Sequence, residues 1–291
     1  MGFGNSISTG QKPMTDKTFE TKPGSDSDAQ LAALFAPLRV RPALLALHAW
    51  HDEIAGLPLR IREPAIGAMR MEWHRDAIRD AFADTPNIRR NPLIEGIASL
   101  KDAAGAPDAD QLLAIVDAYD AGFEGQGFAN VDGLLAYVDQ TEGAVLRMAA
   151  RLIDPVFSDH EKLVQVGRAL GGASLLRIFA LRAARGLGVI PADALTHAGL
   201  STARLASGQE PDKAKAALIS VIELAQEALD LARGDVRALP PELFPAWGAA
   251  ALVPGYLKQA RKVADPYRNA VTLSPLSKRL TLMKASLTGR I

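Results

Sequence analysis

Two pairs of acidic residues are candidates for holding a divalent metal ion. Asp117 and Asp120 are three positions apart, so on a helix they lie one turn apart and can share a face. Two carboxylates so placed can bind Mg²⁺ through water molecules. They can equally pair with nearby arginines, which is the commoner outcome. Asp52 and Glu53 form the second pair, and the simpler interpretation leaves them solvated.

Two histidines precede the second acidic pair. His48, His51 and Asp52 could be metal ligands, since His48 and His51 lie one helical turn apart. A zinc site, however, needs three or four ligands at matching spacings. His74 is available further along the chain, and no pattern in the sequence brings it close. The alternative is an ordinary helix that turns Trp50 and Ile54 toward the core.

A stretch without acidic residues carries the main cationic candidates. No Asp or Glu occurs between Glu161 and Asp193. Such a helix can receive an anion but cannot by itself hold a divalent metal. Its arginines are Arg168, Arg177, Arg182 and Arg185.

Arg182 and Arg185 are one turn apart and can share a face, whereas Arg177 lies well round the helix from Arg182. Buried guanidinium groups need partners. We therefore hypothesise that Arg182 and Arg185 lie at a cavity mouth and meet an anionic head group or acidic side chains. In the alternative they are solvated at a helix C-terminus, where the helix dipole favours cations.

The arginines must be positioned by a long helix, predicted over 158–185. Ser158 and Glu161 have the spacing of a capping box. Glycines cost helix propensity, so their density here predicts that another helix approaches closely at Gly167, Gly171 and Gly172. The apolar residues recur at three- and four-residue steps and predict a buried stripe: Leu163, Val166, Leu170, Ala173, Leu176 and Ala180.

The rest of the chain also has helical patterns and almost no strand signals. The predicted helices cover 29–36, 42–55, 64–83, 92–102, 109–121, 132–152, 158–185, 191–197, 211–233, 245–263 and 275–287. Connections are short, so we predict a single all-α domain over 29–291. Its central cavity is expected between the helices near 42–55, 109–121, 132–152 and 158–185.

Local signals mark the ends of these helices. Asp132 is a plausible N-cap, and Gly143, within 132–152, indicates a helix crossing or, alternatively, room for a ligand. The prolines that suit a first helical turn are Pro42, Pro64, Pro92 and Pro211. The glycines that suit a helix end are Gly56, Gly199 and Gly234, and the helix over 158–185 is expected to run to Gly186.

Composition bounds the functional classes. Apolar residues make up 48% of the 291 residues and the formal net charge is zero, which argues against a general nucleic-acid binder. Cysteine is absent, which excludes disulfides and thiolate metal sites and suits a reducing compartment.

Residues 1–28 are polar and lack the apolar stretch of a secretory signal, so we expect a disordered tail. No apolar run is long enough to span a membrane. The sequence is compatible with peripheral contact to a membrane surface. We expect a cytoplasmic protein.

Four stretches resemble the squalene/phytoene synthase family, the head-to-head prenyl transferases of the isoprenoid-synthase fold. Arg41 to Gly56 is similar to the family's first metal-binding helix. Ile115 to Val145 is similar to its central helix, loop and helix. Ile190 to Ser201 is similar to the segment after its second metal-binding helix, and PAWGAAALVPGYLKQAR to its late helix. The resemblance implies an isoprenoid-synthase-like helical bundle around a central cavity.

The resemblance also implies which residues should act. In active members, two aspartate-rich motifs face each other across the cavity and hold two prenyl diphosphates through Mg²⁺. In this chain the paired aspartates of the first motif correspond to Ala55 and Gly56, and the aspartate of the second motif corresponds to Ala183. Because metal charge stabilises the diphosphate leaving group, these differences argue against the family's reaction.

Family resemblance without the aspartates is typical of a degenerate branch that includes a mitochondrial complex I assembly factor, and MRMEWHRDAI after Pro64 is similar to that branch. The leading hypothesis is a pseudoenzyme without metal or cofactor that binds a prenyl diphosphate, a lipid-like ligand or a partner protein. One alternative is an active Mg²⁺-dependent prenyl transferase that uses other carboxylates. Another is a pure helical scaffold with a filled cavity. The candidate ligand-binding residues are Arg177, Arg182, Arg185, Asp117, Asp120, Asp52 and Glu53.

Overall fold

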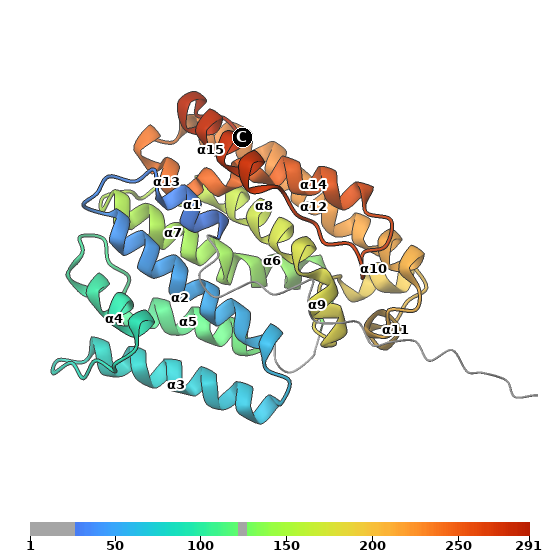
Figure 1. Ribbon diagram of the computed structural model, residues 1–291, viewed down its shortest axis with the longest axis horizontal. Helices are drawn as coiled ribbons and strands as arrows, with labels where there is room; N and C mark the ends of the chain where they lie inside the picture. The colour runs from blue at the N-terminus through green and yellow to red at the C-terminus, as the bar shows by residue number, and fades with distance from the viewer. Residues whose placement is uncertain (1–26, 122–126) are drawn as a thin grey trace, which may run out of the picture.

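Residues 27–121 and 127–291 are described by the computed structural model, and all their regular structure is helical (Figure 1). The predicted all-α fold is confirmed. The first half of the chain contains α1 (Asp28–Ala33), α2 (Arg41–Arg60), α3 (Pro64–Phe82), α4 (Pro92–Ser99), the 3₁₀ helix η2 (Leu100–Asp102), α5 (Ala109–Asp120), α6 (Val131–Gln140) and α7 (Glu142–Ile153). The second half contains α8 (Glu161–Arg177), α9 (Phe179–Ala184), α10 (Ala192–His197), α11 (Thr202–Ser207), α12 (Pro211–Ala238), η4 (Pro241–Leu243), α13 (Phe244–Trp247), η5 (Gly248–Leu252), α14 (Val253–Lys262) and α15 (Pro275–Thr288).

Helix α8 lies at the centre, between α12 on one side and α6 and α7 on the other (Figure 1). A Cβ built at Gly172 would lie only 2.7 Å from Cβ of Ala225 on α12, and one at Gly171 would collide with the side chain of Val138 on α6. The predicted close approach of neighbouring helices is therefore confirmed.

The packing of α8 also decides between the two alternatives predicted for Gly143, a helix crossing and room for a ligand. A Cβ at Gly167 of α8 would lie 2.9 Å from Cα of Gly143 on α7. Gly143 therefore stands at a crossing between two helices, and the alternative of space for a ligand beside it is wrong.

Two predicted long helices are each broken into two. The helix predicted over 158–185 becomes α8 and α9, because Ile178 leaves the helical conformation with φ −103° and ψ 10°. Its start is also wrong: α8 begins at Glu161, and His160 precedes it without a side-chain cap. The helix predicted over 132–152 becomes α6 and α7, separated by Thr141 with φ −104° and ψ −94°.

Several predicted helix ends are wrong because tertiary packing overrides local propensity. Helices α2 and α12 continue through Gly56 and Gly234 to Arg60 and Ala238, whereas Gly186 and Gly199 follow helix ends with positive φ, as predicted. Asn130, not Asp132, caps α6 by accepting a hydrogen bond from the Gly133 amide. Residues 245–263 form three short helices instead of one, and α11 was not predicted. The four prolines at helix starts are confirmed: Pro42, Pro64, Pro92 and Pro211.

The folded domain begins earlier than predicted. Ser27 and Asp28, expected to belong to a tail over 1–28, form the start of α1; Ser27 Oγ accepts a hydrogen bond from the Gln30 amide. The remaining tail residues lie outside the described part of the chain. Helix α1 packs on α2, α13 and η5, so Asp28 enters the interior of the bundle.

Candidate functional site

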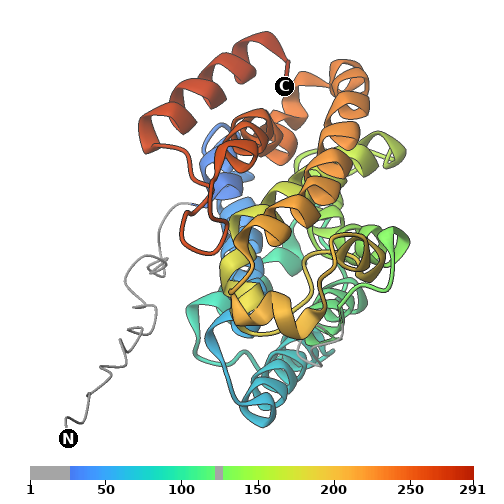
Figure 2. The same ribbon diagram turned by 90° about the vertical axis from the view of Figure 1, so that its right-hand side faces the viewer.

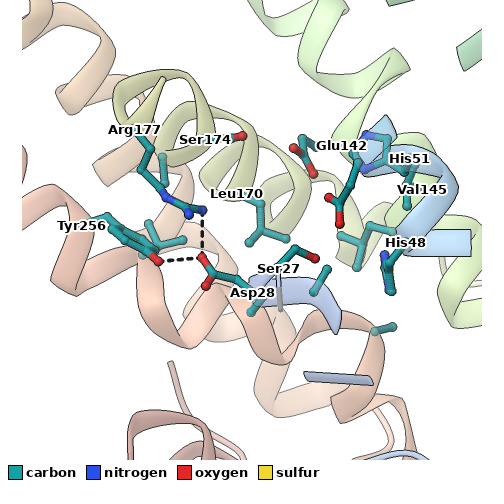
Figure 3. Close-up of a pocket in the computed structure, with 17 residues that line it drawn as sticks. Ser27, Asp28, His48, His51, Glu142, Val145, Leu170, Ser174, Arg177 and Tyr256 are labelled. Carbon is teal, nitrogen blue, oxygen red and sulfur yellow. Dashed lines mark hydrogen bonds and ion pairs between the residues drawn. The ribbon is translucent and has the colours of Figure 1, made fainter. Parts of the chain in front are cut away.

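A pocket with a cavity volume of about 110 Å³ lies between α1, α2, α7, α8, α13, η5 and α14 (Figure 3). Pockets that take drug-sized ligands usually have about 300–1,000 Å³, so this one is small. Of the four helices predicted to surround a central cavity, α2, α7 and α8 contribute lining residues, whereas α5 contributes none. Helix α1 occupies one side, which the sequence did not predict.

Asp28 ties this wall of the pocket to three other helices. Its Oδ2 accepts hydrogen bonds of 2.6 Å from the Tyr256 hydroxyl and 2.8 Å from Arg177 (Figure 3). Its Oδ1 lies 2.7 Å from Nζ of Lys278 on α15. Only 10% of the Asp28 side chain is exposed, and two hydrogen bonds together with the ion pair to Lys278 compensate for the burial of this carboxylate.

Arg177, predicted as a ligand-binding residue, does line the pocket. Its positive charge, however, is already paired with Asp28. Besides its ion pair with Asp28, its guanidinium carbon lies 4.5 Å from the centre of the Tyr256 ring, a cation–π geometry. Burial raises the pKa of Tyr256, so at neutral pH this hydroxyl keeps its proton and donates a hydrogen bond to Asp28. An anion entering the pocket would have to compete with Asp28 for Arg177.

The two histidines of α2 line the pocket without forming a metal site. His51 Nε2 lies 2.8 Å from the hydroxyl of Tyr119, which is buried. Burial, and then the neighbouring His51, lowers the pKa of His48 to about 3, so His48 is neutral at pH 7. Within 27–121 and 127–291, no three histidine or acidic side chains come together as metal ligands.

The acidic pair of α2 is split between the pocket and the surface. Asp52 lines the pocket and accepts a 2.7 Å hydrogen bond from Nε2 of Gln30 on α1. Glu53 instead forms a 2.7 Å ion pair with Arg60 on its own helix. The two carboxylates therefore do not act as a pair.

Asp117 and Asp120 of α5 do share a face, and an arginine binds both. Arg75 on α3 donates from Nε to Asp117 at 2.7 Å and from its terminal nitrogen to Asp120 at 2.6 Å. Burial by itself lowers the pKa of Arg75, but the hydrogen bonds to Asp120 and Asp117 outweigh it and raise that pKa. The predicted alternative of pairing with an arginine is confirmed.

The arginines of α9 and of the α9 C-terminus do not line the pocket. Arg182 is 4% exposed and donates to the Gly188 carbonyl at 2.9 Å and to the Tyr137 hydroxyl at 3.3 Å. Both predictions for Arg182, a position at a cavity mouth and a solvated position, are wrong. Its guanidinium is buried and holds the segment that follows α9. Arg185 caps the end of α9 and is partly buried. Whether any of these predicted residues binds a ligand stays a prediction.

The described carboxylates do not fit the Mg²⁺ that the family's reaction requires. A magnesium site uses carboxylates and water in an octahedral arrangement. Asp117 and Asp120 would have to release the guanidinium of Arg75, and Asp52 is not part of any cluster of three possible ligands among the described residues. These side chains therefore provide no prearranged place for a metal-dependent step.

Sequence reasoning missed Asp28, Tyr256 and Lys278. A usable signal existed for Asp28, because Ser27 and Gln30 have the Ser-x-x-Gln spacing of a helix start. No local signal could have found Tyr256 or Lys278, which reach Asp28 only through tertiary packing.

Comparison with known proteins gives consistent relatives. The squalene/phytoene synthase family model matches residues 22–282. Complex I assembly factor 6, an NADH dehydrogenase (ubiquinone) assembly factor, from Mus musculus is 23% identical over 82% of this chain and 71% of its own length.

Solved structures share the fold. A dehydrosqualene synthase superposes with a TM-score of 0.71 at 14% identity, covering 89% of this chain and 90% of the other. Squalene synthase HpnC from Alicyclobacillus acidocaldarius superposes with a TM-score of 0.61 at 16% identity, covering 89% and 88%. The fold is therefore that of the isoprenoid synthases, and with the family model spanning most of its length, the chain belongs to the squalene/phytoene synthase family.

Proposed function

We propose that this chain is a non-catalytic member of its family that binds a partner protein and acts as an assembly factor. The observation that carries the proposal is the engagement of Arg177: the cation in the central pocket is paired with Asp28 of the same chain. Residues that bind a substrate diphosphate need free positive charge, whether from arginine or from metal. The similarity to complex I assembly factor 6 supports an NADH dehydrogenase of the respiratory chain as the assembled complex.

Two further features support a role other than prenyl transfer. The pocket beside Arg177, at about 110 Å³, is far smaller than the volume that ligand sites usually provide, and α1 forms one of its walls. A second pocket, of about 340 Å³, lies between α5, α6 and α7 and does not include Arg177. The Asp117–Asp120 pair, which could have bound Mg²⁺, is held by Arg75. A prenyl diphosphate or lipid-like ligand remains part of the proposal only as a secondary occupant, which would require α1 to move away.

The competing function is an active prenyl transferase that uses Asp52, Glu53, Asp117 and Asp120. Incubation with farnesyl and geranylgeranyl diphosphates and Mg²⁺, analysed by mass spectrometry, separates the two, with a working squalene synthase as the positive control. We expect no condensed product and no released pyrophosphate. Product that disappears with a chelator would overturn the proposal, and Asp117→Ala and Asp120→Ala would then be the first variants to assay.

The assembly role is tested in the organism that encodes the protein. Deletion of the gene should lower the amount of assembled NADH dehydrogenase complex on native gels, and the wild-type gene should restore it. Unchanged complex in the deletion strain would contradict the role. The predicted cytoplasmic location also stays a proposal, which cell fractionation with an epitope-tagged protein tests in the same strain. No described helix is both long and apolar enough to cross a membrane.

A further inference from the structure

Helix α15 (Pro275–Thr288) lies at the outer edge of the molecule (Figure 2). It exposes a row of large apolar side chains. Leu276 is 67% exposed, Leu280 56%, Met283 53% and Leu287 85%. At 3.6 residues per turn these four positions fall within a sector of about 60°. Single exposed apolar residues are ordinary, but a continuous row marks an interaction surface.

The row is not the side by which α15 packs on the bundle. Leu282 and Ala285 are 1% and 3% exposed, and they lie on the opposite side of the helix from the row. Helix α15 packs on η5 and α1. Lys278 is on that inner side too, where it reaches Asp28. Helix α15 therefore has two apolar sides, and only one of them is used in the fold.

Positive charge flanks the exposed row. Arg279 and Lys284 are exposed and lie about 70° from the centre of the row, one on each side. After Asp265 the sequence contains no acidic residue, whereas its basic residues are Arg268, Lys278, Arg279, Lys284 and Arg290. An apolar stripe between cations is the pattern of a helix that lies in the plane of a membrane surface, with its cations at the head groups.

We propose that α15 is the surface through which this protein docks on an anionic membrane, with its apolar row inserted at the head-group boundary. Charge complementarity selects this occupant. A second copy of α15 would bring Arg279 and Lys284 against the same cations, and like charges across an interface oppose binding. Anionic lipid head groups instead attract each basic residue close to the surface.

The test uses the full chain and vesicles of phosphatidylcholine, with or without phosphatidylglycerol, in flotation assays. We expect binding to the mixed vesicles, weak binding to phosphatidylcholine alone, and weaker binding at high salt. Leu280→Ser with Met283→Ser should lower the bound fraction by about tenfold or more, because two buried apolar side chains are lost. Arg279→Gln with Lys284→Gln should lower binding to mixed vesicles by a similar factor.

Matched variants separate this surface from general surface chemistry. Ile219→Ser with Leu231→Ser removes two exposed apolar side chains from α12, and Arg261→Gln with Lys262→Gln removes two exposed cations from α14; both should bind like the wild type. Circular dichroism confirms that each variant is folded. Wild-type protein that does not bind mixed vesicles, or α15 variants that bind as it does, would overturn the proposal. If vesicle binding is absent and light scattering detects a dimer that Leu280→Ser dissociates, the α15 surface binds a second copy of the chain, and the proposal is overturned.

Discussion

The hydroxyl of Tyr256 donates a 2.6 Å hydrogen bond to Asp28, although 228 residues separate the two in sequence. The same carboxylate pairs with Arg177 of α8 and Lys278 of α15. One side chain in the first turn of α1 therefore connects helices from the middle and the end of the chain. This connection is what closes the central pocket on the side of α1.

Replacing Asp28 by Asn should destabilise the protein by about 1–3 kcal/mol. The variant leaves Arg177 and Lys278 without their anion and weakens the acceptor of Tyr256, and a buried polar group that loses its partner costs about this much. Urea unfolding measures the change. Glu227→Gln, an exposed position on α12, is the control and should change stability by about 0.5 kcal/mol or less. Equal stability of both variants would contradict a structural role for Asp28.

Arg75→Gln should destabilise the protein by about 1 kcal/mol, because Arg75 joins α3 to α5 through charge-assisted hydrogen bonds that are partly screened by solvent. Asp120→Asn should cost more than Asp117→Asn, since the two side chains are 26% and 63% exposed. The control is Arg79→Gln, whose side chain is 53% exposed and pairs with Glu72. Denaturant titrations of the four variants give the order, and a reversed order of the two aspartates would count against this account.

Stability should fall between pH 6.5 and pH 5 in a way that depends on His48. Burial and His51 lower the pKa of His48 from 6.5 to about 3, so in this range the unfolded chain binds a proton that the folded protein does not. Stability is complete above pH 6.5 and decreases on acidification, by about 2 kcal/mol at pH 5 for this one group.

His48→Leu should remove the part of the stability loss on acidification that comes from His48, because the variant has no group to protonate at this position. His74, whose pKa is lowered to about 4 by burial and then by Arg70, continues to contribute in both proteins. His197→Gln is the control, since His197 is exposed. Thermal or urea unfolding at both pH values measures the difference, and an identical acid loss in wild type and His48→Leu would refute the prediction.

Two glycines in long helices should respond in opposite ways to alanine. Gly172→Ala should destabilise by about 1–3 kcal/mol, because its Cβ would lie 2.7 Å from that of Ala225 and would push α8 from α12. Gly234→Ala should stabilise by up to about 1 kcal/mol, because a Cβ there has no atom within 4 Å and alanine favours the helix. Melting temperatures of both variants test the pair, and two shifts of the same sign would be inconsistent with the packing.

Part of the candidate site could be predicted from local spacing. Asp117 and Asp120 share a face because a helix places residues three apart one turn from each other, and this relation needs no tertiary structure. That an arginine pairs with them could be expected only as one of two alternatives, and the sequence did not identify Arg75, because the partner lies on another helix. For Arg182, local spacing led to a wrong prediction. The sequence placed it at a cavity mouth, but the turn after α9 brings the Gly188 carbonyl to its guanidinium.

The sequence by itself determined the all-α class, the family, the proline starts of four helices and the glycine face of α8. These depend on helical periodicity, on steric rules for single residues and on patterns that extend along the chain. Only the tertiary structure decided that Asp28 belongs to the interior, that Ile178 and Thr141 interrupt two helices, and that the pocket is small. The reason is physical: burial, helix breaks and ion pairs such as Asp28–Arg177 depend on which surfaces pack together, and local sequence carries no record of a partner 149 residues away.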